Sequence, residues 1–123
     1  MDITAAAACL TVADPARSTD FYTRQFGFEC VQDLREKGRT VRAVLRHGDA
    51  TLLIASGDPE TSRTGHAALY LFVASAREAH QALAAAGAEV ADVALTTYGM
   101  EEFHLRDPDG HVIAIGSPAV QLA

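Results

Sequence analysis

Hydrophobic and polar residues alternate most clearly near the end of the chain, in residues 103–117. There Phe103 and Leu105 alternate with polar residues, and Ile113 and Ile115 share one face, which is the period of strands with one buried face. The run Asp-Pro-Asp-Gly between them carries the residues that a tight turn favours at each position. This stretch therefore predicts a two-stranded hairpin.

The first half of the chain predicts the order strand, helix, strand, strand, strand. An apolar run at residues 5–12 has the length of a buried strand. Asp14 is a helix N-cap followed by Pro15 at the first helical position, and Gly27 ends the helix. Alternating residues then predict strands at 28–34, 41–45 and 51–55.

The second half repeats this order, which indicates an internal duplication. A strand is expected at residues 66–73, with Leu69 and Leu71 on one face. Ser75 caps the next helix, and Glu78 stands at the capping-box position. A strand at 89–95 and the closing hairpin complete the second module.

Residues 57–65 are polar and rich in turn formers, so we expect a linker there and no regular structure. The prediction is a single α+β domain made of two βαβββ modules, at about residues 1–56 and 66–118. Each sheet carries a helix on its outer face only. The two modules are expected to form one curved mixed sheet whose concave side is a cleft.

Composition narrows the classes of function. The chain has 123 residues and a formal net charge of −6, which disfavours nucleic acid and anionic membranes as partners. Cys9 and Cys30 have no motif spacing and are interpreted as packing residues of a reducing compartment. The first residues lack a basic signal region, and no apolar run has spanning length, so we expect a cytoplasmic protein.

Two stretches resemble the vicinal oxygen chelate superfamily of glyoxalases, bleomycin-resistance proteins and extradiol dioxygenases. Val12-Ala13-Asp14, followed by STDFY at 18–22 and FGF at 26–28, resembles the opening of its members. Residues 102–111, EFHLRDPDGH, are similar to the closing motif. The resemblance covers nearly the whole chain and is closest to the bleomycin-resistance branch. It implies paired βαβββ modules, usually in homodimers, with a ligand or a metal in the concave cleft.

The same resemblance implies where a metal would be held in catalytic members, namely on the first and last strands of each module. These positions fall on Ala7, Leu53, Ala68 and Ala114. None of these side chains has an oxygen, nitrogen or thiolate donor for a divalent ion. His66, two residues away on the same strand face, supplies at most one ligand. We therefore predict that the protein binds no metal.

Strand parity selects the candidate ligand-binding residues. Tyr70 and Phe72 fall on the face that the helix does not cover, as do Glu102 and His104 in the closing hairpin. Aromatic walls with a few polar groups are typical of small-molecule pockets. The same residues suit a dimer interface equally well. The expected ligand-binding set is Arg42, Leu53, His66, Tyr70, Phe72, Tyr98, Glu102 and His104.

The other candidate chemistry has simpler explanations. His47 and His111 stand in or beside turns and are expected to be solvated, and His80 is expected on the surface or partly buried. Asp107 and Asp109 have a sufficient role in their turn. A metal held by His66, Glu102 and His104 is a less favoured alternative. Arg42 is either an anion-binding residue or a plain surface charge.

The favoured hypothesis is a metal-free homodimer that binds a small aromatic or cationic molecule and sequesters it, as in drug resistance. It needs no cofactor and no catalytic residues. The alternative is a metal-dependent lyase, isomerase or dioxygenase with a displaced metal site. A third possibility is a dimeric module without a small ligand. Metal analysis followed by ligand screening separates the three.

Overall fold

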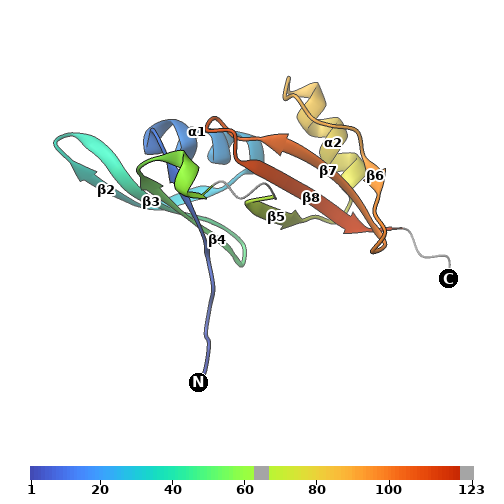
Figure 1. The fold of residues 1–123 in the computed structure, drawn as a ribbon, viewed down its shortest axis with the longest axis horizontal. Coiled ribbons are helices and arrows are strands. Elements are labelled where there is room, and N and C mark those ends of the chain that lie inside the picture. The colour runs from blue at the N-terminus through green and yellow to red at the C-terminus, as the bar shows by residue number, and fades with distance from the viewer. Residues whose placement is uncertain (63–66, 120–123) are drawn as a thin grey trace. The chain divides into compact units, whose positions relative to one another are not determined.

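A computed structural model describes residues 1–62 and 67–119 of the chain (Figure 1). The chain divides into two compact units, Met1–Arg63 and Thr64–Ala123, and the boundary lies within the expected linker. Each unit contains one four-stranded mixed sheet and one α-helix. The α+β class and the repeated βαβββ order are confirmed. The joint sheet and cleft of the two modules, and their grouping into one domain, stay predictions.

The first unit follows the order that the residue pattern predicts. Its helix begins after Asp14, whose carboxylate accepts a hydrogen bond from the backbone N–H of Arg17, and ends at Gly27 with φ of 73°. Its sheet has the order β1-β4-β3-β2, with β1 parallel to β4. The elements are β1 (Ala8–Val12), α1 (Pro15–Phe26), β2 (Glu29–Glu36), β3 (Arg39–His47), β4 (Ala50–Ser56) and a short 3₁₀ helix, η1 (Pro59–Ser62).

The second unit repeats this topology, as Figure 1 shows. Its sheet has the order β5-β8-β7-β6, with β5 parallel to β8. Ser75 caps the helix by accepting a hydrogen bond from the N–H of Glu78. The elements are β5 (Leu69–Phe72), α2 (Ala76–Ala85), β6 (Ala94–Leu95), β7 (Met100–Arg106) and β8 (Val112–Pro118). Among the residues described, no helix is long and apolar enough to cross a membrane.

Each sheet buries one face. The buried face of the second sheet includes Phe103, and the ring of His80 from α2 lies 5.1 Å from the Phe103 ring, edge to face. Each fully buried aliphatic or aromatic side chain contributes about 1.5–3 kcal/mol. The side chains that can contact a ligand or a partner therefore lie on the opposite face of each sheet. The core of the first unit includes Leu10, Val12, Tyr22, Leu45, Leu52 and Ile54, and that of the second includes Phe103, Leu105, Ile113 and Ile115.

Three segments differ from expectation. The predicted linker contains η1, because the carboxylate of Asp58 accepts the N–H of Glu60 and orders this turn. The strand expected at 66–73 is limited to β5. The strand expected at 89–95 is limited to β6, which is a sheet edge. Alanines in 88–94 favour strands weakly, which explains why so little of that segment pairs.

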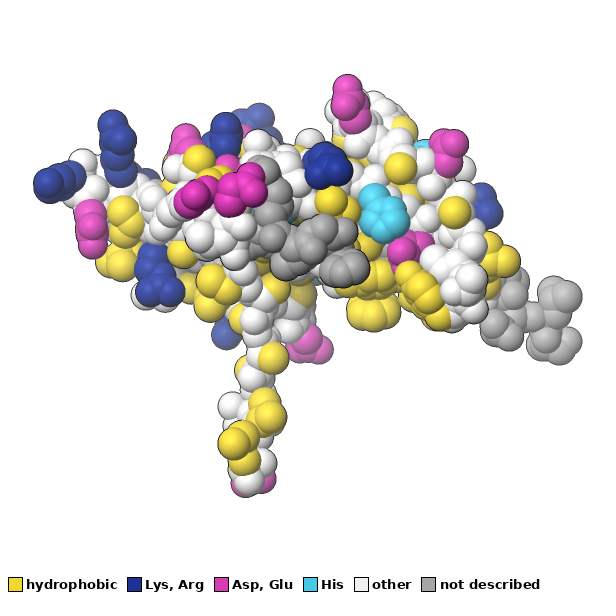
Figure 2. All heavy atoms as spheres, in the orientation of Figure 1, with side chains coloured by type: hydrophobic (Ala, Val, Ile, Leu, Met, Phe, Trp, Pro, Cys, Tyr) yellow, Lys and Arg dark blue, Asp and Glu magenta, His cyan; other side chains and the backbone are white. Residues whose placement is uncertain are grey.

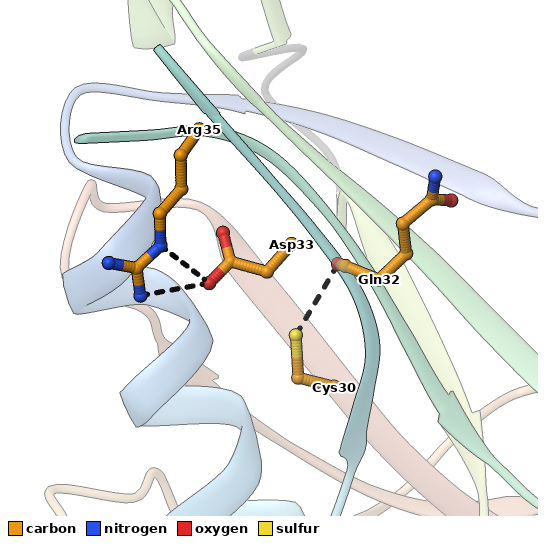
Figure 3. A network of polar contacts seen from close by, with 4 residues as sticks. All are labelled: Cys30, Gln32, Asp33 and Arg35. Carbon is orange, nitrogen blue, oxygen red and sulfur yellow. Dashed lines mark hydrogen bonds and ion pairs between the residues drawn. The ribbon is translucent and has the colours of Figure 1, made fainter. Parts of the chain in front are cut away.

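The cysteines are not packing residues, contrary to expectation, since both Cys9 and Cys30 are exposed. Figure 3 shows Cys30 in β2, where its thiol donates to the backbone oxygen of Gln32 at 3.4 Å. The guanidinium of Arg35 donates twice to Asp33 in the same strand. The hydroxyl of Thr40 and then Arg35 lower the pKa of Asp33. Every residue of β2 is exposed, so lying in this strand does not bury Cys30.

His111 is also not solvated, contrary to expectation, since it is 1% exposed. The carboxylate of Asp107 accepts hydrogen bonds of 2.9 Å from the backbone N–H groups of Asp109 and of His111. The backbone N–H of Asp107 in turn donates to the carbonyl of His111. These bonds fold the turn back on itself and bury His111. His47 is exposed and His80 half-buried, as expected.

Candidate functional site

The open face of the second sheet presents the residues that strand parity selected. Tyr70 of β5 and His104 of β7 both pair with Ala114 of β8. Phe72 and Glu102 likewise both pair with Gly116. Since these pairs alternate with the buried pairs of the core, the four side chains share the face opposite α2. The expected convergence of the two strands is therefore present.

Glu102 is the centre of this face. It is 7% exposed, and its Oε2 accepts hydrogen bonds from the hydroxyls of Tyr70 at 2.8 Å and of Tyr98 at 2.6 Å. The Nε2 of His104 lies 3.4 Å from the other carboxylate oxygen, Oε1. We call Tyr70, Tyr98, Glu102 and His104 the Glu102 cluster. A buried carboxylate is stable only when its oxygens have such partners.

Aromatic surface lies next to the Glu102 cluster. The rings of Tyr70 and Phe72 are 4.7 Å apart, and Phe72 is 78% exposed. Tyr98 is 64% exposed although its hydroxyl is bonded to Glu102. Figure 2 shows an exposed histidine beside an acidic side chain in the second unit, with hydrophobic side chains next to them. The face combines ring surfaces with a few fixed polar groups, the usual composition of a small-molecule site.

Gly116 makes room for Tyr70. A Cβ atom at residue 116 would lie 2.8 Å from Cζ of Tyr70 and closer still to the hydroxyl oxygen. Tyr70 therefore lies directly on the backbone of β8, and a side chain at residue 116 would displace its ring. Sequence reasoning missed this residue, although an isolated glycine within a predicted strand is a signal of close approach.

The phenols are held in their protonated form. Burial, followed by the hydrogen bond and charge of Glu102, raises the pKa of Tyr70 to about 12. For Tyr98 the hydrogen bond to Glu102 is the main cause of a raised pKa. Because both hydroxyls keep their protons throughout the neutral range, both remain donors to Glu102. The phenols are therefore not nucleophiles or bases at neutral pH.

We predict that a tyrosine of the native protein ionises late in an alkaline titration. The raised pKa of Tyr70 stabilises the fold below about pH 10, and this contribution is lost as the pH rises toward about 12. The ultraviolet absorbance of phenolate should show a late step that Tyr70→Phe removes. Glu102→Gln should shift this step to lower pH. An unchanged titration in Tyr70→Phe would contradict the assignment.

The first unit holds the two remaining expected residues. Arg42 of β3 and Leu53 of β4 line one cavity of about 270 Å³ on the open side of the first sheet. Arg42 makes no ion pair with any residue that the structure describes. Sequence reasoning did not select the other lining residues, of which Gln32 and Leu34 lie in β2, where register shifts interrupt the alternation. The lining residues are Gln32, Leu34, Arg42, Ala43, Val44, Leu53 and Ile54.

The structure thus gathers the expected ligand-binding residues into two groups. Tyr70, Phe72, Tyr98, Glu102 and His104 lie together in the second unit. Arg42 and Leu53 lie together in the first. His66 lies outside the described residues. The role of all these residues in binding stays a prediction.

The model of the Glyoxalase/Bleomycin resistance protein/Dioxygenase superfamily matches residues 4–115. The chain belongs to this superfamily. No curated protein matches the sequence.

Solved structures share the superfamily fold at low sequence identity. TnmS3, an antibiotic binding protein from Streptomyces sp. CB03234, is 21% identical with a TM-score of 0.75, covering 97% of this chain and 99% of its own. A bleomycin-binding protein from Streptomyces verticillus, in complex with copper(II)-bleomycin, is 22% identical with a TM-score of 0.71 and coverages of 98% and 99%. The fosfomycin resistance protein FosX from Listeria monocytogenes is 19% identical with a TM-score of 0.74 and coverages of 98% and 97%.

The residues at the four positions that the resemblance implies for a metal do not fit one. Ala114 is 1% exposed in the centre of the second open face, and its methyl group offers no donor. Leu53 stands in the corresponding strand of the first unit, and Ala7 and Ala68 precede the first strands. No group of three His, Cys, Asp or Glu side chains within residues 1–62 and 67–119 suits a metal ion.

Proposed function

We propose that the protein is a small-molecule binding protein of the superfamily, which holds a planar aromatic, cationic ligand on the open face of its second unit. The observation that carries the proposal is the Glu102 cluster beside Phe72. It places aromatic rings and a buried carboxylate on one sheet face. A planar cation gains from stacking on the rings and from the nearby negative charge.

Sequestration accounts for this site better than catalysis does. One oxygen of Glu102 already accepts two phenol hydroxyls, so it is poorly placed to remove a proton from a substrate. The hydroxyls of Tyr70 and Tyr98 keep their protons at neutral pH, as argued above. Affinity alone requires none of these groups to react. The net charge of −6 also favours a cationic ligand over an anionic one.

Two further features belong to the proposal. The similarity to antibiotic-binding and bleomycin-binding structures supports a role in drug sequestration. A homodimer is supported by exposed hydrophobic residues on both units, such as Leu34 and Leu95. A second copy of the chain would bury this hydrophobic surface. Two-fold dimers are the commonest closed assembly.

Ligand screening with two matched variants tests the proposed function. We expect planar aromatic cations to raise the melting temperature of the protein, without any added metal. Phe72→Ala should weaken their binding about tenfold or more, because burying a phenylalanine against a ligand is worth about 1.5–3 kcal/mol. Leu95→Ala is the control, since Leu95 is similarly exposed on the edge strand β6. Equal losses in both variants, or a requirement for metal, would contradict the proposal.

A further inference from the structure

We propose that Glu102 is a positioning residue that makes the Glu102 cluster a surface of hydrogen-bond acceptors, selecting planar cations with N–H donors over anions of the same shape. This inference rests on the proposed function and specifies its ligand. It follows from counting the protons of the cluster.

Both phenol protons are committed to Glu102. Each hydroxyl has one hydrogen to donate and two lone pairs that accept. The hydrogens of Tyr70 and Tyr98 both point to Oε2 of Glu102, at O···O distances of 2.8 and 2.6 Å. Neither phenol has a proton left for a ligand. Each oxygen therefore presents only lone pairs to the outside.

The carboxylate itself is screened from direct contact. Glu102 is 7% exposed, whereas Tyr98 is 64% exposed and Tyr70 is half-buried. A ligand donor therefore reaches the phenol oxygens before it reaches the carboxylate. The negative charge behind the phenols strengthens them as acceptors, because hydrogen bonds in a chain polarise one another.

His104 is the third outward-facing group of the Glu102 cluster. Its Nε2 faces Oε1 of Glu102 at 3.4 Å, and the side chain is 50% exposed. A carboxylate oxygen accepts but does not donate, so the neutral tautomer that suits Oε1 is the one with its proton on Nε2. In the neutral ring Nδ1 is then an acceptor. With the ring in this neutral tautomer, all three outward groups of the cluster accept hydrogen bonds.

The ligand class follows from the cluster and the neighbouring ring. Phe72, 4.7 Å from Tyr70 between ring centres, offers an exposed face for stacking. A matching ligand is an aromatic or conjugated plane with two or more N–H donors and a positive charge. Amidinium, guanidinium and protonated aminoheterocyclic groups meet this description. A carboxylate of the same shape brings only acceptors and is rejected.

Benzamidine and benzoate form a matched pair of probes, since they share size and planarity and differ in charge and in donors. Their affinities are measured on the full chain by following backbone amide signals of β5 and β7 in NMR titrations, so that binding near Arg42 is scored separately. We expect benzamidine to bind at least about tenfold more tightly than benzoate at these strands. Glu102→Gln should reduce this ratio to near one, because the amide group removes the charge and frees a phenol proton. Glu101→Gln is the control, since Glu101 pairs with Arg77 instead of joining the cluster.

The outcomes separate this inference from the proposed function. One outcome is that benzamidine and benzoate bind equally well to the unaltered protein and that Phe72→Ala weakens the binding of both. The proposed ligand site is then correct, and the proposed acceptor surface is wrong. If neither probe binds at these strands at about millimolar concentration, both ideas are wrong. If Glu102→Gln does not fold, Tyr98→Phe replaces it, because Tyr98 is exposed and the change removes one acceptor. A preference that does not fall at all in that variant overturns the inference.

Discussion

Replacing Gly116 with alanine is expected to weaken ligand binding on the second unit strongly while the protein still folds. The added Cβ would lie 2.8 Å from Cζ of Tyr70 and closer to its hydroxyl oxygen. Tyr70 must then swing off β8 and lose its hydrogen bond to Glu102. We expect planar cations to bind more than about tenfold more weakly, and the free energy of unfolding to fall by about 1–3 kcal/mol.

Two controls make this result specific. Gly57→Ala introduces a similar conflict, 2.8 Å from Cγ2 of Thr11 in the first unit, and should cost stability without affecting binding at β5. In a Tyr70→Ala background, Gly116→Ala should cost little, because the atoms that it displaces are gone. Additive losses of stability in the double variant would show that Tyr70 does not lie on Gly116.

Replacing Asp107 with alanine is expected to destabilise the second unit strongly. The carboxylate of Asp107, 5% exposed, accepts the backbone N–H groups of Asp109 and of His111, each at 2.9 Å. Removing it leaves two buried donors without their acceptor, and each costs about 1–3 kcal/mol. We expect urea denaturation to show a loss of about 2–4 kcal/mol in the free energy of unfolding.

Asparagine and a second turn provide the comparison. Asp107→Asn keeps a side-chain oxygen in place and should lose about 1 kcal/mol, since hydrogen bonds to a neutral acceptor are weaker. Asp49 lies in the β3–β4 turn of the first unit and is exposed. Asp49→Ala should have little effect. Equal losses in the free energy of unfolding for Asp107→Ala and Asp49→Ala would contradict the role assigned to Asp107 in the β7–β8 turn.

The duplicated fold could be predicted because its signals are local. Asp14 with Pro15, Ser75 with Glu78, and Gly27 define where the helices begin and end, and their capping bonds or geometry are present. Period-two alternation then placed the strands. It failed at the alanine-rich segment before β6, where alternation is weak.

The candidate site could be predicted in part. Parity alone put Tyr70, Phe72, Glu102 and His104 on one face, and the ladder of β5, β7 and β8 confirms this placement. Parity could not show that Tyr98 turns back to Glu102, since that contact depends on the conformation of a turn. It also could not show that the carboxylate is buried beneath two phenols. That detail changes the expected role of Glu102 from a ligand contact to a positioning residue.

The most direct test of the central claim is to locate a bound planar cation on the protein. Intermolecular nuclear Overhauser effects between benzamidine and the protein would identify the side chains that touch it. We predict contacts with the rings of Phe72 and Tyr98, and their loss in Phe72→Ala. Contacts confined to other parts of the chain, unchanged in Phe72→Ala, would contradict the proposed ligand site.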